Sequence, residues 1–115
     1  MKQLQQLSLL ILAMMLVACQ QLGLEEPQTF DERLAYAYSQ NAAIRKSAAD
    51  ALTARTITKS DAQQVLSTTD TARSALDEAR KFQTGGDTST ALGKLQMAQS
   101  LLTTVQTFLK TKGVK

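Results

Sequence analysis

The chain has 115 residues and a formal net charge of +3, from 13 Lys and Arg against 10 Asp and Glu. An excess this small, without a basic stripe interleaved with aromatic residues, is not typical of a nucleic-acid binder, so we expect no nucleic-acid partner. The chain has no histidine and one cysteine, which excludes Cys/His and Ser/His/Asp catalysis and the commonest zinc sites, and predicts a non-enzymatic protein with no catalytic residue, metal or cofactor.

A short apolar run dominates the beginning of the chain. Lys2 precedes residues 7–18 (LSLLILAMMLVA), about a dozen apolar residues, whereas a membrane-spanning helix needs roughly 20. A basic start, a short apolar middle and small residues at the end are typical of an export signal. The run ends in Leu16-Val17-Ala18-Cys19, which resembles the lipobox of bacterial lipoproteins.

The lipobox resemblance implies how the chain is processed and where it resides. In that family the cysteine thiol receives a diacylglyceryl group and the signal is cut just before it, so we expect cleavage between Ala18 and Cys19 and lipidation of Cys19. A signal with a chance cysteine and a buried cytoplasmic helix are the alternatives, but the order of charge, apolar length, small residue and cysteine favours the lipoprotein. Because Gln20 and not aspartate follows the cysteine, the resemblance implies the periplasmic face of the outer membrane.

Residues 19–28 are predicted to be a lipidated tether. They contain the only proline, Pro27, and show no helical or strand period. The remaining residues, 29–112, are enough for one small domain.

The first predicted helix covers about residues 30–55. Thr29 followed by Glu32 three residues later is the capping-box pattern. Apolar or small residues then recur at steps of three, four and seven, with Asn41 in one slot, which indicates a helix and not a strand. The predicted inward stripe is Phe30, Leu34, Ala37, Ile44, Ala48 and either Ala51 or Leu52.

The second predicted helix covers about residues 59–83. Thr58 and Asp61 form another capping-box pattern, and Gly85 or Gly86 suits a left-handed helix end. The predicted inward stripe is Ala62, Val65, Thr69, Ala72, Leu76, Ala79 and Phe82.

The third predicted helix covers about residues 88–111 and begins after Asp87 or Ser89. Three helices of similar length with short connections pack most simply as an up-down-up antiparallel three-helix bundle, which makes the expected fold class all-α. An alanine-rich core this small is marginal alone, so self-association through the third helix and modest stability both stay open. The third stripe is Leu92, Leu95, Ala98, Leu102, Val105 and Leu109.

Two features invite a functional interpretation. Asp77 and Glu78 are adjacent, but neighbours on a helix point about 100° apart, so a solvated charged face is favoured over an acid/base pair. After Asp87 the chain has no acidic residue, and Lys110, Lys112 and Lys115 are predicted to form a basic tip. That tip is either a solvated helix end that complements the helix dipole or a contact with the anionic cell wall.

The segments "ITKSDAQQVLSTTDTARSALDEAR" and "ALGKLQMAQSLLTTVQTFLKTK" resemble small alanine-rich lipoproteins of phages, prophages and proteobacteria. That group has no assigned activity, so the resemblance implies no functional residues. Two functions are compatible with these features. One is a lipid-anchored interaction module that acts on envelope proteins, peptidoglycan or superinfecting phage, and the other is a structural spacer between the outer membrane and the cell wall.

The lipid anchor gives the first prediction. Cys19→Ser should abolish labelling of the protein by a clickable palmitate analogue and move it out of the membrane fraction, because the acylated thiol is gone. Unchanged labelling of the variant would contradict the assignment of Cys19.

Overall fold

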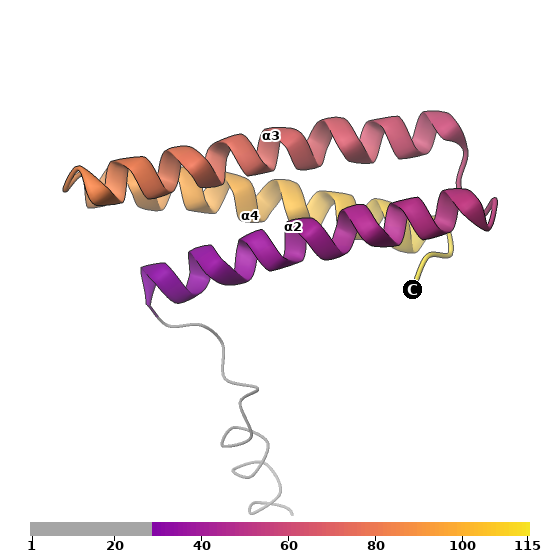
Figure 1. The fold of residues 1–115 in the computed structure, drawn as a ribbon, viewed down its shortest axis with the longest axis horizontal. Helices are drawn as coiled ribbons and strands as arrows, with labels where there is room; N and C mark the ends of the chain where they lie inside the picture. The colour runs from indigo at the N-terminus through magenta and orange to yellow at the C-terminus, as the bar shows by residue number, and fades with distance from the viewer. Residues whose placement is uncertain (1–28) are drawn as a thin grey trace, which may run out of the picture.

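The computed structural model describes residues 29–115; the predicted signal peptide and tether, with Ala18 and Cys19, lie outside this range. The described residues are helical, with no strand among them, which confirms the all-α class. The helices lie side by side along the long axis of the molecule (Figure 1). The first helix ends two residues earlier than expected, and the second helix ends one residue later than expected. The helices are α2 (Phe30–Thr53), α3 (Lys59–Thr84) and α4 (Thr88–Thr111).

Each helix begins at a side-chain cap that satisfies one of its free amide groups. The hydroxyl of Thr58 accepts a hydrogen bond from the Asp61 amide at 3.1 Å, and the Asp61 carboxylate accepts one from the Thr58 amide at 3.0 Å. This reciprocal pair is the predicted capping box. Thr29 caps α2 and Asp87 caps α4 in the same position, each accepting from the amide three residues later.

Each helix also ends in the same type of turn. A residue in the left-handed conformation follows the last helical turn, and the amide after it reaches back five residues, to the carbonyl of the third-last residue of the helix, the Schellman arrangement. The left-handed residue is Gly86 after α3 and Gly113 after α4, where glycine has no Cβ to clash. After α2 it is Arg55, with a φ of 60°.

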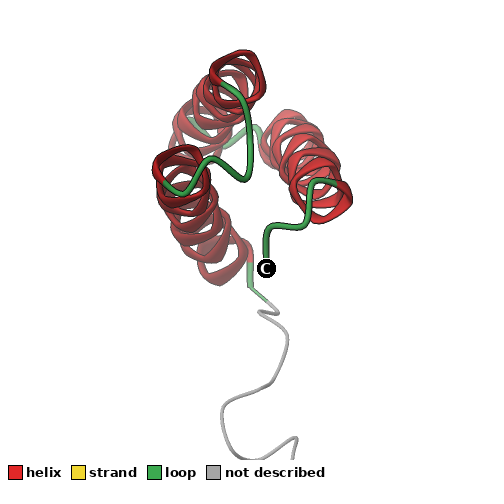
Figure 2. Ribbon diagram, turned by 90° about the vertical axis from the view of Figure 1, so that its right-hand side faces the viewer, coloured by secondary structure: helices red, strands yellow, loops and turns green. Residues whose placement is uncertain are grey.

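Leucine and alanine side chains fill the space between the helices. The largest fully buried side chains are Leu76 of α3 and Leu95 and Leu102 of α4, none more than 1% exposed. Seen from its end, the bundle has its helices at the corners of a triangle (Figure 2). The α3–α4 contact is the most extensive, and the buried apolar residues of α2 are Leu34, Ile44, Ala37, Ala48 and Ala51. No helix within residues 29–115 is both long and apolar enough to cross a bilayer.

A polar row joins α2 to α3 beside this apolar core. The buried Asn41 side chain donates from Nδ2 to the backbone carbonyl of Thr69 at 2.8 Å. On one side of it Arg45 forms an ion pair with Asp70, and on the other the Tyr38 hydroxyl donates to Asp77. Burial and this bond raise the pKa of the Tyr38 phenol. The Asn41 slot noted in the sequence is therefore a buried hydrogen-bonding position.

Three side chains of the predicted stripes, those of Phe30, Phe82 and Leu92, are less buried than expected. Phe82 is 36% exposed, because Gln83, one heptad after Leu76, takes the inward position in the last turn of α3. Leu92, in the second turn of α4, and Phe30, the first residue of α2, are only partly buried. Of the two candidates at the end of α2, Ala51 is buried and Leu52 is exposed.

The core gives the second prediction. Leu102→Asp places a charge in a position that is 1% exposed, which should cost several kcal/mol, comparable with the entire stability of about 5–15 kcal/mol of a natural domain. Residues 29–115 with this change should lose their cooperative thermal unfolding followed by circular dichroism. Thr103→Asp, at the exposed neighbouring position, should leave the transition in place. An unchanged midpoint for Leu102→Asp would show that the inward face of α4 is wrongly assigned.

Candidate functional site

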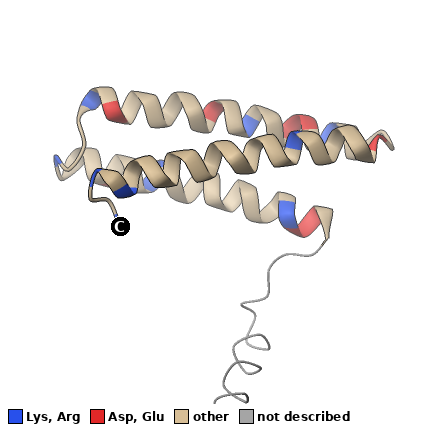
Figure 3. Cartoon of the chain, turned by 180° about the vertical axis from the view of Figure 1, so that it is seen from behind, with Lys and Arg blue, Asp and Glu red and all other residues tan. Residues whose placement is uncertain are grey.

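Basic side chains gather at one end of the bundle, which we call the basic end. This end holds the turn between α2 and α3 and the last turn of α4, and Figure 3 shows its Lys and Arg residues close to the C-terminus. Only two acidic residues, Asp50 and Asp61, lie near them in the described chain. The basic residues are Arg55, Lys59, Lys110, Lys112 and Lys115.

The structure brings the three predicted lysines to this end, but they differ in their contacts. The Lys112 Nζ lies 3.8 Å from Asp61 Oδ1 and 5.5 Å from the centre of the Phe108 ring, so Lys112 ties the end of α4 to the first turn of α3. Lys110 and Lys115 form no ion pair within residues 29–115. Lys110 and Lys115 are therefore the two predicted lysines whose charge is free to meet a partner.

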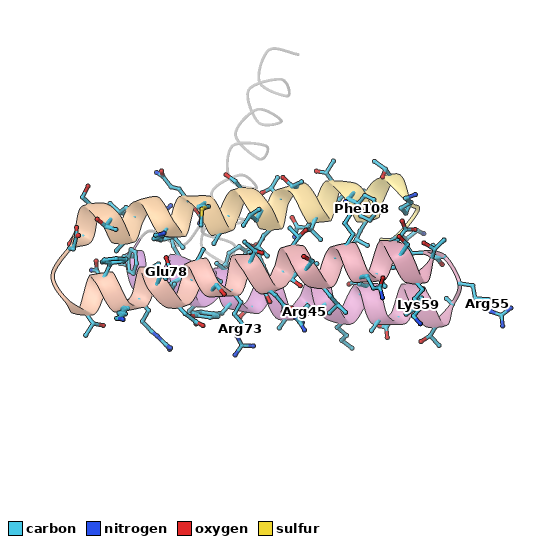
Figure 4. All side chains as sticks on the ribbon, turned by 90° about the horizontal axis from the view of Figure 1, so that it is seen from above. Arg45, Arg55, Lys59, Arg73, Glu78 and Phe108 are labelled. Carbon is cyan, nitrogen blue, oxygen red and sulfur yellow. The ribbon has the colours of Figure 1, made fainter. Side chains whose placement is uncertain are left out.

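Two further cations at the basic end occupy positions that are unfavourable for them. Arg55 adopts the left-handed conformation, which costs a residue with a Cβ roughly 1–2 kcal/mol. Lys59 is the first residue of α3, where the positive end of the helix dipole repels a cation. Figure 4 shows the Arg55 side chain directed away from the end of the bundle, with Lys59 beside the same turn. Neither side chain forms an ion pair in the described part of the chain.

Arg55 and Lys59 were missed because they are far in sequence from the lysines of the third helix. A local signal was present in the pattern of helix ends. The second helix ends in Gly85-Gly86, whereas the first ends in Ala54-Arg55, where glycine is the favoured residue. A cation that replaces the expected glycine is a reason to examine the turn for function.

The opposite end of the bundle, where α2 begins, carries both signs of charge. Asp31 lies in the first turn of α2, Asp87 caps α4, and Lys81 lies in the last turn of α3. The Arg33 guanidinium donates to the side-chain carbonyl of Gln99 at 3.1 Å and so joins α2 to α4 there. The charge of the described chain is therefore asymmetric along the bundle axis, with the excess of cations at the basic end.

A hollow of about 210 Å³ opens between α2 and α4 at the basic end. Ile44 and Leu109 contribute buried apolar surface to it, and Lys110 and Lys115 stand at its edge. A second hollow of about 280 Å³ shares Ser47, Val114 and Lys115 with it and also contains Asp50 and Thr56. In Figure 2 the C-terminal residues after α4 extend toward α2.

The adjacent carboxylates of α3 are held apart by different partners. Asp77 accepts the hydrogen bond from Tyr38 of α2, whereas Glu78 Oε2 lies 2.7 Å from Lys94 Nζ of α4. The two side chains thus serve two different helix contacts, as expected for a charged face. Within residues 29–115 no group of three or more acidic side chains is placed to hold a metal ion.

Comparisons of the chain with protein-family models, with curated proteins and with solved structures give no match. The function is therefore inferred from the chemistry of the residues at the basic end.

Asp61 gives the third prediction, because it links the helix cap to Lys112. The hydrogen bond that the Thr58 amide donates to the Asp61 carboxylate is the main cause that holds the pKa of Asp61 below its ordinary value of 3.8. The Thr58 hydroxyl and Lys112 lower this pKa further. A lowered pKa in the folded state means that ionised Asp61 stabilises the fold above about pH 4, and that this stabilisation is lost as the pH falls through the folded pKa. The free energy of unfolding, measured by urea titration between pH 7 and pH 2, should therefore decrease in acid, and Asp61→Asn should weaken that decrease.

Thr58→Ala is the matched control for this titration. It removes the hydroxyl that caps α3, and should lower stability by about 1 kcal/mol at neutral pH, but it keeps the bond from the amide to the Asp61 carboxylate. Most of its acid dependence should therefore persist, because the hydrogen bond from the Thr58 amide is the largest cause of the lowered pKa of Asp61. An Asp61→Asn protein with the same pH profile as the parent chain would contradict the assigned role of the carboxylate.

Proposed function

We propose that the protein is a non-enzymatic interaction module, cleaved after Ala18 and anchored by a lipid on Cys19 to the periplasmic face of the outer membrane, whose basic end contacts peptidoglycan. The anchor rests on the lipobox resemblance of residues 16–19. The single observation that carries the contact is the position of five cations, two of them locally unfavourable, at the end of the bundle opposite the start of α2.

The proposed topology is an up-down-up antiparallel bundle, which supports this placement. Across α2 and α3, Tyr38 contacts Asp77 while Arg45 contacts Asp70, so residue numbers rise on one helix as they fall on the other. Across α3 and α4, Lys112 lies beside Asp61. With this order the start of α2 and the end of α4 are at opposite ends of the bundle.

The length of the helices sets the reach of the contact. A helix of 24 residues, such as α2, is ~36 Å long at 1.5 Å per residue. A tether attached before Thr29 would therefore place the basic end well away from the membrane surface. Cell-wall peptides carry carboxylates, and Lys and Arg side chains form charge-assisted hydrogen bonds with such groups. The same reach supports the spacer function, because a bundle attached at both ends would hold the wall at a set distance.

Sedimentation with purified peptidoglycan tests the contact and gives the fourth prediction. At low salt, residues 29–115 should sediment with the polymer, and the combined change of Lys110, Lys112 and Lys115 to Gln should release much of the bound protein. Lys81→Gln, which removes one charge at the opposite end, should leave binding unchanged. Absence of binding at low salt, or identical binding by the triple variant, would contradict the proposal.

Arg55 allows the same experiment to separate function from structure. Arg55→Gly should raise the free energy of unfolding by about 1 kcal/mol, because glycine adopts the left-handed conformation without strain, and should nevertheless weaken sedimentation with peptidoglycan. A purely structural role would not give a more stable protein that binds less well. An Arg55→Gly protein that is more stable and binds as before would remove Arg55 from the contact.

A further inference from the structure

The hollow between α2 and α4 has the features of a small ligand site within the basic end. Ile44 and Leu109 are each only 4% exposed and give it an apolar floor. Ser47 and Gln106 add neutral hydrogen-bonding groups from the two facing helices. Lys110 and Lys115 also line the hollow, and neither forms an ion pair within residues 29–115.

We propose that this hollow binds the carboxylate end of a short peptide made of small residues, as presented by the peptide arms of peptidoglycan. The inference rests on the proposed function and deepens it, because it turns a charge-driven contact into a defined subsite. The apolar floor receives a methyl-sized side chain, and the two lysines receive the carboxylate.

The size of the hollow supports a small occupant. Its volume of about 210 Å³ is below the roughly 300–1,000 Å³ of pockets that bind drug-sized ligands. One or two residues with small side chains match such a space, whereas an aromatic side chain or a sugar ring together with a peptide would exceed it. The Ser47 hydroxyl and the Gln106 amide can donate to and accept from the peptide backbone of such a ligand.

The charges around the hollow favour one orientation of a bound peptide, with its carboxylate on one side. Two ammonium groups without acidic partners attract a carboxylate, and bonds between ionised groups are about twice as strong as neutral ones. The second hollow shares Lys115 with the first, does not include Lys110, and contains Asp50, which repels a carboxylate. The ligand is therefore oriented with its carboxylate toward Lys110 and Lys115 and the rest of the peptide toward Asp50.

Titration of the full-length protein in non-ionic detergent with acetyl-D-alanyl-D-alanine tests this subsite. In amide NMR spectra the peptide should shift the signals of Ile44, Ser47, Gln106 and Val114 with millimolar affinity. The same peptide with a C-terminal amide should bind about tenfold more weakly or not at all, because the carboxylate is lost. Equal shifts from both peptides, or no shifts at these residues, would overturn the inference.

A pair of phenylalanine variants separates the subsite from the basic end as a whole. Ala43 lines the hollow and is exposed, so Ala43→Phe should fill it and weaken dipeptide binding about tenfold or more while all five cations remain. Ala42→Phe, at an exposed position outside the hollow, should bind the dipeptide like the parent chain. Equal dipeptide binding by the two variants would overturn the inference.

The peptidoglycan experiment keeps the two proposals distinguishable. If the chain sediments with peptidoglycan but does not bind the dipeptide, the subsite is refuted and the basic-end contact stands. If it binds neither, both are refuted. Dipeptide binding that depends on the carboxylate and is lost in Ala43→Phe supports the subsite.

Discussion

The position of α2 in the bundle depends on one buried hydrogen bond, from the Asn41 side chain to the backbone carbonyl of Thr69. An amide buried among apolar side chains costs free energy unless it finds a partner. Sliding α2 by one turn along α3 would separate the two groups and leave the amide unpaired in the core. Apart from Leu34 and Ile44, the buried apolar residues of α2 are alanines, which pack similarly in several registers, so this bond and the flanking contacts of Arg45 and Tyr38 select one register among them.

That register determines what the basic end contains. It brings Ile44 and Ser47 of α2 opposite Gln106 and Leu109 of α4, so that a hollow remains between the helices. It also places the turn with Arg55 at the end of the bundle where α4 terminates. A polar residue in the core thus specifies the surface on which the proposed contact depends, a use of buried polar groups known from coiled coils.

Local sequence signals predicted the helices but not the contacts between them. The capping box of Thr58 and Asp61 involves residues only three apart, and the left-handed Gly86 comes two residues after the end of α3. Both features are local, so the sequence predicts them. The partner of Asn41 lies 28 residues away, and the neighbours of Lys110 come from α2, which no local pattern encodes. The spacing of three and four residues along α3 predicts that Phe82 faces the core. In the structure Gln83, seven residues after Leu76, faces the core instead, and Phe82 is exposed.

The threonines of α3 and α4 give the sides of the bundle a distinct character. Thr68, Thr71 and Thr104 are three of several whose hydroxyls donate to the backbone carbonyl four residues earlier, at 2.9–3.0 Å. A hydroxyl bonded to its own helix is less available to water or to a neighbour, and each such residue also presents a methyl group. At these positions the flanks of the molecule therefore present methyl groups and engaged hydroxyls. A neighbouring macromolecule finds little free polar chemistry there, so the groups that can distinguish one partner from another are the charged side chains between the threonines and those at the basic end.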